Sequence, residues 1–206
     1  IRGKIAGYNL GSRSKTNDTS YTATFTVSDN GTDYAAASAV PVNIVLTDSS
    51  NNSTSAFTTA ISQAGDAIYA NTPDVTLSSD LTTIAEDGGV ATITATLTNS
   101  LNNQWPEDIG FTLGFTGTAT NTTDYTRSSS SITISAGNSS NTVTITGVAD
   151  DLFDAASNET VIVSFDCIQT GAATLLSGQT QTITITDAES APTVTLSVNN
   201  SSIDED

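Results

Sequence analysis

Apolar and polar residues alternate along several short stretches between residues 73 and 191. In the stretch 90–99, for example, an apolar residue stands at every second position and threonines fill most of the positions between. Alternation with a period of two is typical of β-strands that bury one face. We therefore predict seven strands separated by polar turns, at 75–78, 90–99, 109–117, 131–135, 141–148, 160–167 and 180–186. Seven short strands of this kind predict an all-β fold, an antiparallel sandwich of the up-and-down or Greek-key type.

A long repeat divides the chain into three parts. The stretch "PDVTLSSDLTTIAED" (73–87) aligns without a gap on "PTVTLSVNNSSIDED" (192–206), at an offset of 119 residues. Self-similarity at a fixed offset marks tandem modules. We expect 73–191 to be a complete module and 192–206 to be the first strand of a following, incomplete repeat. At the same offset, 1–72 aligns loosely with the later part of the module, which predicts a preceding, degenerate repeat; a different kind of β-domain in 1–72 is the alternative.

Composition agrees with strands and excludes several classes of protein. Serine and threonine make up close to a third of the chain, while apolar residues reach 36% and aromatic residues 6%. Threonine suits a pleated, half-exposed surface. A single cysteine excludes a disulfide framework within the chain. No apolar run approaches the roughly 18 residues of a membrane helix, so we expect no membrane insertion in this segment.

Charge is strongly negative and unevenly distributed. The formal net charge is −17, which argues against nucleic acid as a partner because phosphates would be repelled. Residues 1–72 hold five acids against four bases, whereas residues 73–206 hold 17 acids against the single base Arg127. Two interpretations follow: a solvated acidic surface that aids solubility, or acids gathered around a cation.

The positions of the acids on the predicted strands favour a cation. In a sandwich, alternate loops lie at the same pole, and the acids of the module fall in such loops. They are Glu86, Asp124, Asp150, Asp151, Asp154, Glu159, Asp187 and Glu189. This many carboxylates at one end would repel one another unless a counter-ion lay between them. Ca²⁺ takes six to eight oxygen ligands from irregular loops, whereas zinc is disfavoured because the chain has no His and only one Cys. A solvated acidic pole stays open as the alternative.

Four stretches in order resemble a Calx-β domain, a family found in sodium–calcium exchangers and in large bacterial surface proteins. They are "IAEDGGVATITATL", "GTATNTTDY", "SITISAGNSSNTVTITGVADDLFDAASNETVIVSF" and "TITITDAES". The resemblance covers 73–191 and the repeated stretch at 192–206. It implies tandem seven-stranded, immunoglobulin-like Greek-key sandwiches and Ca²⁺ clustered at one pole.

The resemblance also implies a set of calcium ligands. Carried over by position, the family's ligands fall on Glu86, Asp124, Asp150, Asp151, Asp154, Glu159, Asp187 and Glu189. Ala188 interrupts the terminal acidic run, and Ala149 and Ala155 stand where richer members carry carboxylates. These departures imply fewer bound ions or weaker binding.

The expected function is that of a calcium-stiffened spacer in the stalk of an extracellular, adhesin-like repeat protein, with neighbouring repeats as its partners. One alternative is a filament in which "TVTLSV" (193–198) is donated to another copy; another is a glycan- or partner-binding module. We expect no enzyme, because the chain has no histidine base and no nucleophile elbow. Cys167 falls on the apolar face of its strand, which predicts a core position, and Trp105 is expected to plug one end of the sandwich.

Overall fold

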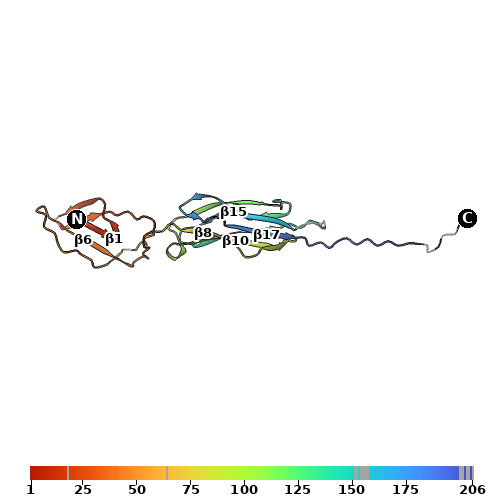
Figure 1. Ribbon diagram of the computed structural model, residues 1–206, viewed down its shortest axis with the longest axis horizontal. Helices are drawn as coiled ribbons and strands as arrows, with labels where there is room; N and C mark the ends of the chain where they lie inside the picture. The colour runs from red at the N-terminus through yellow and green to blue at the C-terminus, as the bar shows by residue number, and fades with distance from the viewer. Residues whose placement is uncertain are drawn as a thin grey trace.

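The computed structural model describes residues 1–17, 19–63, 65–150, 153, 158–199, 202 and 205. Within this part of the chain the structure is almost entirely strand and turn, with one 3₁₀ turn, η1 (Leu101–Asn103). An N-terminal body, a β-sandwich and an extended C-terminal segment follow one another along the long axis of the molecule (Figure 1). The all-β fold class predicted from the sequence is confirmed.

The N-terminal body consists of small sheets. Its strands are β1 (Arg2–Ile5), β2 (Tyr8–Asn9), β3 (Arg13–Asn17), β4 (Ser20–Ala23), β5 (Ala39–Val40), β6 (Val42–Val45) and β7 (Ile61–Ser62). They form one three-stranded sheet in the order β2-β1-β6 and two strand pairs, β3-β4 and β5-β7. Few of its side chains are fully buried; Val40, Val42 and Ala70 are among them. Its membership of the same repeat as the sandwich stays a prediction.

The sandwich is built from two five-stranded sheets. Its strands are β8 (Asp74–Ser79), β9 (Thr83–Ala85), β10 (Val90–Thr98), β11 (Ile109–Gly117), β12 (Tyr125–Arg127), β13 (Ser131–Ile134), β14 (Ser140–Gly147), β15 (Glu159–Thr170), β16 (Thr174–Leu175) and β17 (Thr180–Thr186). The sheet orders are β12-β14-β10-β8-β16 and β13-β11-β15-β17-β9. All seven predicted strands are present within one or two residues, apart from β15, which continues to Thr170; β9, β12 and β16 are short additions. The order, in which β10 lies between β8 and β14 while β11 lies beside β15, is that of an immunoglobulin-like Greek key.

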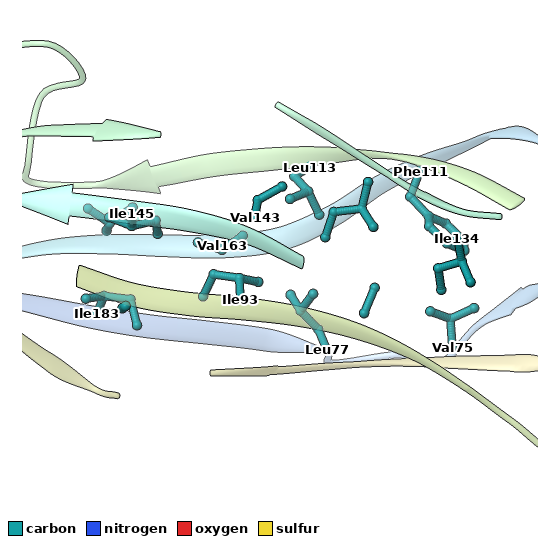
Figure 2. Packing of buried hydrophobic residues seen from close by; sticks show 14 of the residues in the cluster. Val75, Leu77, Ile93, Phe111, Leu113, Ile134, Val143, Ile145, Val163 and Ile183 are labelled. Carbon is teal, nitrogen blue, oxygen red and sulfur yellow. The ribbon is translucent and has the colours of Figure 1, made fainter. Parts of the chain in front are cut away.

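The core lies between the two sheets and follows from the alternation in the sequence. Along β10 the buried positions are every second residue, from Ala91 to Leu97. Ile93 of β10, Ile145 of β14, Phe111 of β11 and Val163 of β15 point into the same space, where they are fully buried (Figure 2). Because threonines occupy the outer face of these strands, one sequence pattern supplies both the core and the soluble surface.

A β-bulge in β15 changes which residues face the core. The register between β11 and β15 shifts, so that Leu113 pairs with Phe165 whereas Thr112 pairs with Cys167. Asp166 is the additional residue, so the alternation is inverted at Cys167 and Ile168; a second register shift follows, since Phe111 pairs with Ile168 and Gly110 with Thr170. Cys167 is therefore exposed, its sulfur 2.9 Å from Thr112 Oγ1, while Ile168 packs against the core. The prediction of a core position for Cys167 is wrong, because strict alternation does not account for a bulge.

Contacts at the pole near β8 join the sandwich to the N-terminal body. Trp105 packs against the core cluster, as predicted, and its ring lies edge-on to Tyr69 with 5.6 Å between centroids. Asp29 accepts hydrogen bonds from Thr72 N–H (3.2 Å) and Thr72 Oγ1 (2.7 Å). Asp33 likewise accepts from Ala70 N–H (2.7 Å). The linker 70–72, which leads into the sandwich, is therefore held by hydrogen bonds from its own neutral N–H and O–H groups to the carboxylates of Asp29 and Asp33.

The described part of the chain contains no helix with the length and apolar character needed to cross a membrane.

Candidate metal centre

The acidic pole lies at the opposite end of the sandwich from Trp105. Five chain segments meet there because the sheet pairings bring them together. The β9–β10 connection follows Ala85, which pairs with Thr186 at the end of β17. β15 begins at Glu159, paired with Ile185, and β12 begins at Tyr125, paired with Gly147 at the end of β14. Side chains next to these pairs must therefore share one end of the molecule.

Glu86 is positioned by a tight turn packed against β14. Its N–H donates to the Thr186 carbonyl (3.1 Å), and its own carbonyl accepts from Gly88 N–H (2.7 Å). Gly88 has φ +92°, a left-handed conformation that favours glycine. Gly147 lies under this turn: a Cβ there would stand 2.4 Å from the Ala85 carbonyl oxygen and 2.8 Å from Glu86 Cα. Two glycines thus allow the turn to carry Glu86 over the end of the sandwich.

Asp124 is fixed by a turn and by a link to the strand that leads to Asp150. Its carboxylate accepts from Thr120 N–H (2.5 Å), and its own N–H donates to the Thr120 carbonyl (2.9 Å). Its carbonyl accepts from Val148 N–H (3.0 Å), just beyond β14. The hydrogen bond at Val148 ties the turn to the segment 148–150, so Asp124 and Asp150 are held at the same pole.

A small cavity lies between these segments. Its walls hold five carboxylates together with two aliphatic side chains: Glu86, Asp124, Asp150, Glu159, Asp187, Val148 and Ile185. Its volume of about 20 Å³ is enough for one water molecule or one ion. Asp150 is exposed, and the other four acids are half-buried. Five carboxylates around so little space form a strongly negative site.

Glu189 extends the cluster into the segment that leaves the sandwich. Carboxylate oxygens of Glu86, Asp187 and Glu189 lie within 4.8 Å of one another. Glu189 N–H donates to Asp187 Oδ1 (2.7 Å), and Ala188 N–H approaches Glu86 Oε1 at 3.4 Å. Glu189 Oε2 is buried without a hydrogen-bond partner among the described residues. Such an oxygen normally has a partner, so this one favours a proton or a cation at the same place.

The same crowding perturbs the titration of Glu189. The adjacent Glu86 carboxylate, then burial, then the neighbouring Asp187 raise the pKa of Glu189 to about 7. A proton shared between two carboxylates is the usual consequence when like charges are held together without a counter-ion. Binding of a proton or a cation by this cluster near neutral pH is therefore favourable, because it reduces the repulsion between the carboxylates.

All six of the predicted ligands that the structure describes come together at this pole. Five line the cavity, and Glu189 lies beside two of them. Asp151 and Asp154 lie outside the described residues. Asp87, next to Glu86 in sequence, is exposed and does not line the cavity. The metal-binding role of these acids stays a prediction.

The sequence analysis missed the residues that position the acids. Gly147 and Val148 have no ligand chemistry, and their role depends on a packing contact and a backbone hydrogen bond. The signal available in the sequence was a glycine at the last position of an otherwise alternating strand, which marks close approach of another backbone.

The donor set fits a hard, oxygen-seeking cation. Every polar side chain that lines the cavity is a carboxylate, and the chain contains no histidine. Ca²⁺ accepts six to eight oxygens in irregular geometry, including mono- and bidentate carboxylates, whereas Mg²⁺ demands a near-ideal octahedron. Glu189 Oε2, buried and without a partner, is an additional oxygen that such an ion would satisfy. The residues present therefore fit calcium better than magnesium or zinc.

Comparison with known proteins finds partial similarity to two solved structures. No family model and no curated protein matches the chain. The crystal structure of CBD12 from CALX1.2 is 16% identical with a TM-score of 0.46, over 55% of this chain and 44% of that one. The crystal structure of the apo-form Calx CBD1 domain is 15% identical with a TM-score of 0.42, over 56% of this chain and 99% of that one. The chain thus spans less than half of the first structure, and neither similarity says which side chains bind a ligand.

Proposed function

We propose that the sandwich binds Ca²⁺ in the acidic cavity and that the chain serves as a calcium-stiffened spacer of an extracellular, adhesin-like repeat protein. The observation that carries the proposal is the convergence of five carboxylates from five segments on one small cavity, with Glu189 beside them. The sequence resemblance to Calx-β domains points the same way.

The residues that would hold the ion are the five lining acids and Glu189. Bound calcium would supply the positive charge that offsets their mutual repulsion. The chain's own contribution is positioning: the glycine turn sets Glu86, the Thr120–Asp124 turn sets Asp124, and the start of β15 sets Glu159.

Stiffening follows from where the ligands sit. Asp187 and Glu189 belong to the segment that leaves β17, whereas Glu86 and Asp124 belong to the body of the sandwich. An ion held by both groups fixes the exit direction of the chain, and its loss leaves like charges that repel the segment away from the loops. The effect on the joint is therefore mechanical as well as stabilising.

The joint at the opposite pole supports this assignment by contrast. There, Asp29 and Asp33 accept hydrogen bonds from the linker residues Ala70 and Thr72. These carboxylates have neutral donors as partners, and no group of three potential ligands occurs there among the described residues. We assign calcium dependence to the joint after β17 alone.

An extracellular location is part of the proposal because of the affinity expected. The half-exposed ligands on loops resemble sites that bind calcium at about 10⁻⁴–10⁻³ M, the range of extracellular modules. Alanine at positions 149 and 188 removes two further carboxylate positions, which favours the weak end of that range. A site of this kind fills outside the cell and stays empty at cytosolic calcium levels.

Thermal unfolding with calcium and with chelator tests the site. At a calcium concentration about 100 times the Kd, binding adds about 2.7 kcal/mol, which raises the Tm of a sandwich this size by roughly 10 °C. Asp124→Ala and Asp150→Ala should each remove most of this shift. Glu107→Ala, an exposed acid at the other pole, is the matched control and should keep it. An equal shift in all three variants would show that calcium acts elsewhere.

Hydrogen exchange tests the stiffening separately from binding. Calcium should increase protection of the amides of 186–190 and leave 70–74 unchanged, because only the first set adjoins the cavity. Calcium binding without added protection at 186–190 would retain the metal site and reject the spacer mechanism.

A further inference from the structure

Two threonines connect the end of β11 to the start of β15 near the acidic cavity. The last backbone pair of these strands is Gly117 with Val161. Beyond it, Thr160 N–H donates to Thr118 Oγ1 (2.9 Å), Thr118 N–H approaches Thr160 Oγ1 at 3.4 Å, and the two hydroxyl oxygens lie 3.3 Å apart. Ala119 N–H donates to the Thr160 carbonyl (3.0 Å). Side-chain hydroxyls therefore continue the contact between the two strands where the regular ladder stops.

The Thr118–Thr160 contact joins the segments that carry two of the candidate ligands. Thr160 directly follows Glu159, the first residue of β15. On the other side, Thr120 N–H donates to the Asp124 carboxylate (2.5 Å), and the Thr120 carbonyl accepts from Asp124 N–H (2.9 Å). The segment 118–120 thus contacts the start of β15 at one end and the Asp124 carboxylate at the other.

The same series of hydrogen bonds reaches a third candidate ligand. The Asp124 carbonyl accepts from Val148 N–H (3.0 Å), two residues before Asp150. Three of the five acids that line the cavity therefore lie on segments that hydrogen bonds connect to one another. Neither Thr118 nor Thr160 lines the cavity, so any effect of these threonines on an ion must act through the acids.

The relative positions of the acids matter more for calcium than for magnesium. Ca²⁺ takes six to eight oxygens, so at this cavity it has to engage most of the lining carboxylates at once. Mg²⁺ keeps several of its water ligands and is usually bound through one or two carboxylates. A contact that holds Asp124 in place relative to Glu159 therefore affects calcium affinity more than magnesium affinity.

We propose that the Thr118–Thr160 contact positions Asp124 and Glu159 relative to each other and so determines the preference of the acidic cavity for calcium over magnesium. The inference rests on the proposed function, because it takes this cavity to be the ion site. Thr118 and Thr160 are positioning residues. Without their hydroxyls, the turn that carries Asp124 keeps its contact at Val148 but is held less firmly against β15.

Thr118→Val tests the contact because it keeps the branched shape of the side chain and removes the hydroxyl that accepts Thr160 N–H. Loss of one such hydrogen bond should raise the calcium Kd about three- to tenfold. The magnesium Kd should change much less, so the ratio of the magnesium Kd to the calcium Kd should fall. Calorimetric titration of the 206-residue chain with each metal chloride measures both constants. Thr160→Val should act in the same direction, and Thr118→Ser, which restores the hydroxyl, should recover most of the loss.

Thr112→Val is the matched control. Thr112 Oγ1 donates to the Cys167 carbonyl (3.3 Å), so this hydroxyl also connects β11 to β15, but it lies away from the acidic cavity. The variant should leave both metal dissociation constants unchanged. If Thr112→Val raised the calcium Kd as much as Thr118→Val, or if Thr118→Val lowered calcium and magnesium affinity equally, the inference would be overturned.

Hydrogen exchange in chelator tests the positioning without an ion. Thr120 N–H, the donor to the Asp124 carboxylate, should exchange several-fold faster in Thr118→Val than in the wild-type chain and in Thr112→Val. An unchanged exchange rate would contradict the positioning role. The wild-type titration separates the two proposals: a chain that binds no calcium rejects the proposed function, whereas wild-type binding that Thr118→Val leaves unchanged rejects this inference alone.

Discussion

Glu189 is the side chain of the acidic pole whose pKa is most affected by the neighbouring carboxylates. Its carboxylate lies close to that of Glu86. Its Oε2 is buried without a partner among the described residues, and its pKa is raised to about 7. The raised pKa means that the folded protein binds a proton that the unfolded chain releases above about pH 4.5. A proton and a cation therefore compete for the same oxygens.

Without calcium, the stability of the sandwich should fall as pH rises from about 4.5 to about 7. In this interval the folded state holds more protons than the unfolded state, so the free energy of unfolding decreases with pH and levels off above about 7. Urea unfolding in chelator between pH 4.5 and 8 measures this slope. Asp80, whose pKa is lowered by the Thr92 N–H, acts in the opposite direction, but only below about pH 4.

Glu189→Gln is the matching control for that pH dependence. The variant keeps the size of the side chain and removes the titrating group, so its stability in chelator should be nearly independent of pH over the same interval. A wild-type slope that persists in Glu189→Gln would assign the titration to another group.

The turn between β9 and β10 depends on the end of β14 beneath it. Gly147 N–H donates to the Gly89 carbonyl (2.9 Å), and the absence of a Cβ at Gly147 leaves room for the backbone of 85–86. The turn carries Glu86, and β14 continues toward Asp150. The position of the Glu86 carboxylate therefore depends on how the β9–β10 turn packs against the end of β14.

Gly147→Ala should lower calcium affinity by at least about tenfold although it removes no ligand. The new methyl group meets backbone atoms that have no rotamer freedom, so the turn must shift and carry Glu86 with it; the accompanying loss of stability should be about 1–3 kcal/mol. Calcium titration by calorimetry measures the affinity. Gly110→Ala, at the other pole and against the Thr170 hydroxyl, should leave calcium affinity unchanged.

The bulge in β15 predicts that substitution of Cys167 has little effect on the free energy of unfolding. Because Cys167 is exposed and Ile183 is fully buried, Cys167→Ser should change the free energy of unfolding by no more than about 0.5 kcal/mol, whereas Ile183→Ala should cost about 2–5 kcal/mol. Urea unfolding compares the two variants. A cost for Cys167→Ser as large as that for Ile183→Ala would mean that the strand continues without the bulge.

The molecule has two joints of different chemistry at the two ends of one sandwich. The joint to the N-terminal body combines the Tyr69–Trp105 contact with hydrogen bonds to Asp29 and Asp33. The other end carries the carboxylate cluster. The extended C-terminal segment leaves the sandwich at that end (Figure 1). On the proposed function, the joint after β17 depends on bound calcium, whereas the joint to the N-terminal body does not.

Trp105, the single tryptophan of the chain, reports on the first joint alone. Tyr69→Ala should shift its emission to longer wavelength, because the exposed edge of the indole gains water. Calcium titration of the wild-type chain should leave the emission unchanged, since the acidic cavity lies at the other pole. An emission change on calcium binding would mean that the two joints are coupled through the sandwich.

Sequence alone determined the strands of the sandwich and the candidate acids, and the reason is the same for both. A period of two determines which face of each strand is buried. Because successive loops alternate between the two ends of a sandwich, the position of a loop in the strand order determines at which end its acids lie. Thus β10 and β17 coincide with the alternating stretches, and Glu86, Asp124 and Asp187 were assigned to one end before their spatial arrangement was known.

Tertiary structure decided what depends on contacts between distant segments. The bulge at Asp166, which places Cys167 outside, arises from pairing with β11, and local alternation carries no record of it. The room that Gly147 leaves for the turn of Glu86 and the partnerless Oε2 of Glu189 both require segments packed within a few ångströms of each other. Periodicity specifies which residues face inward, and only packing specifies which of them meet.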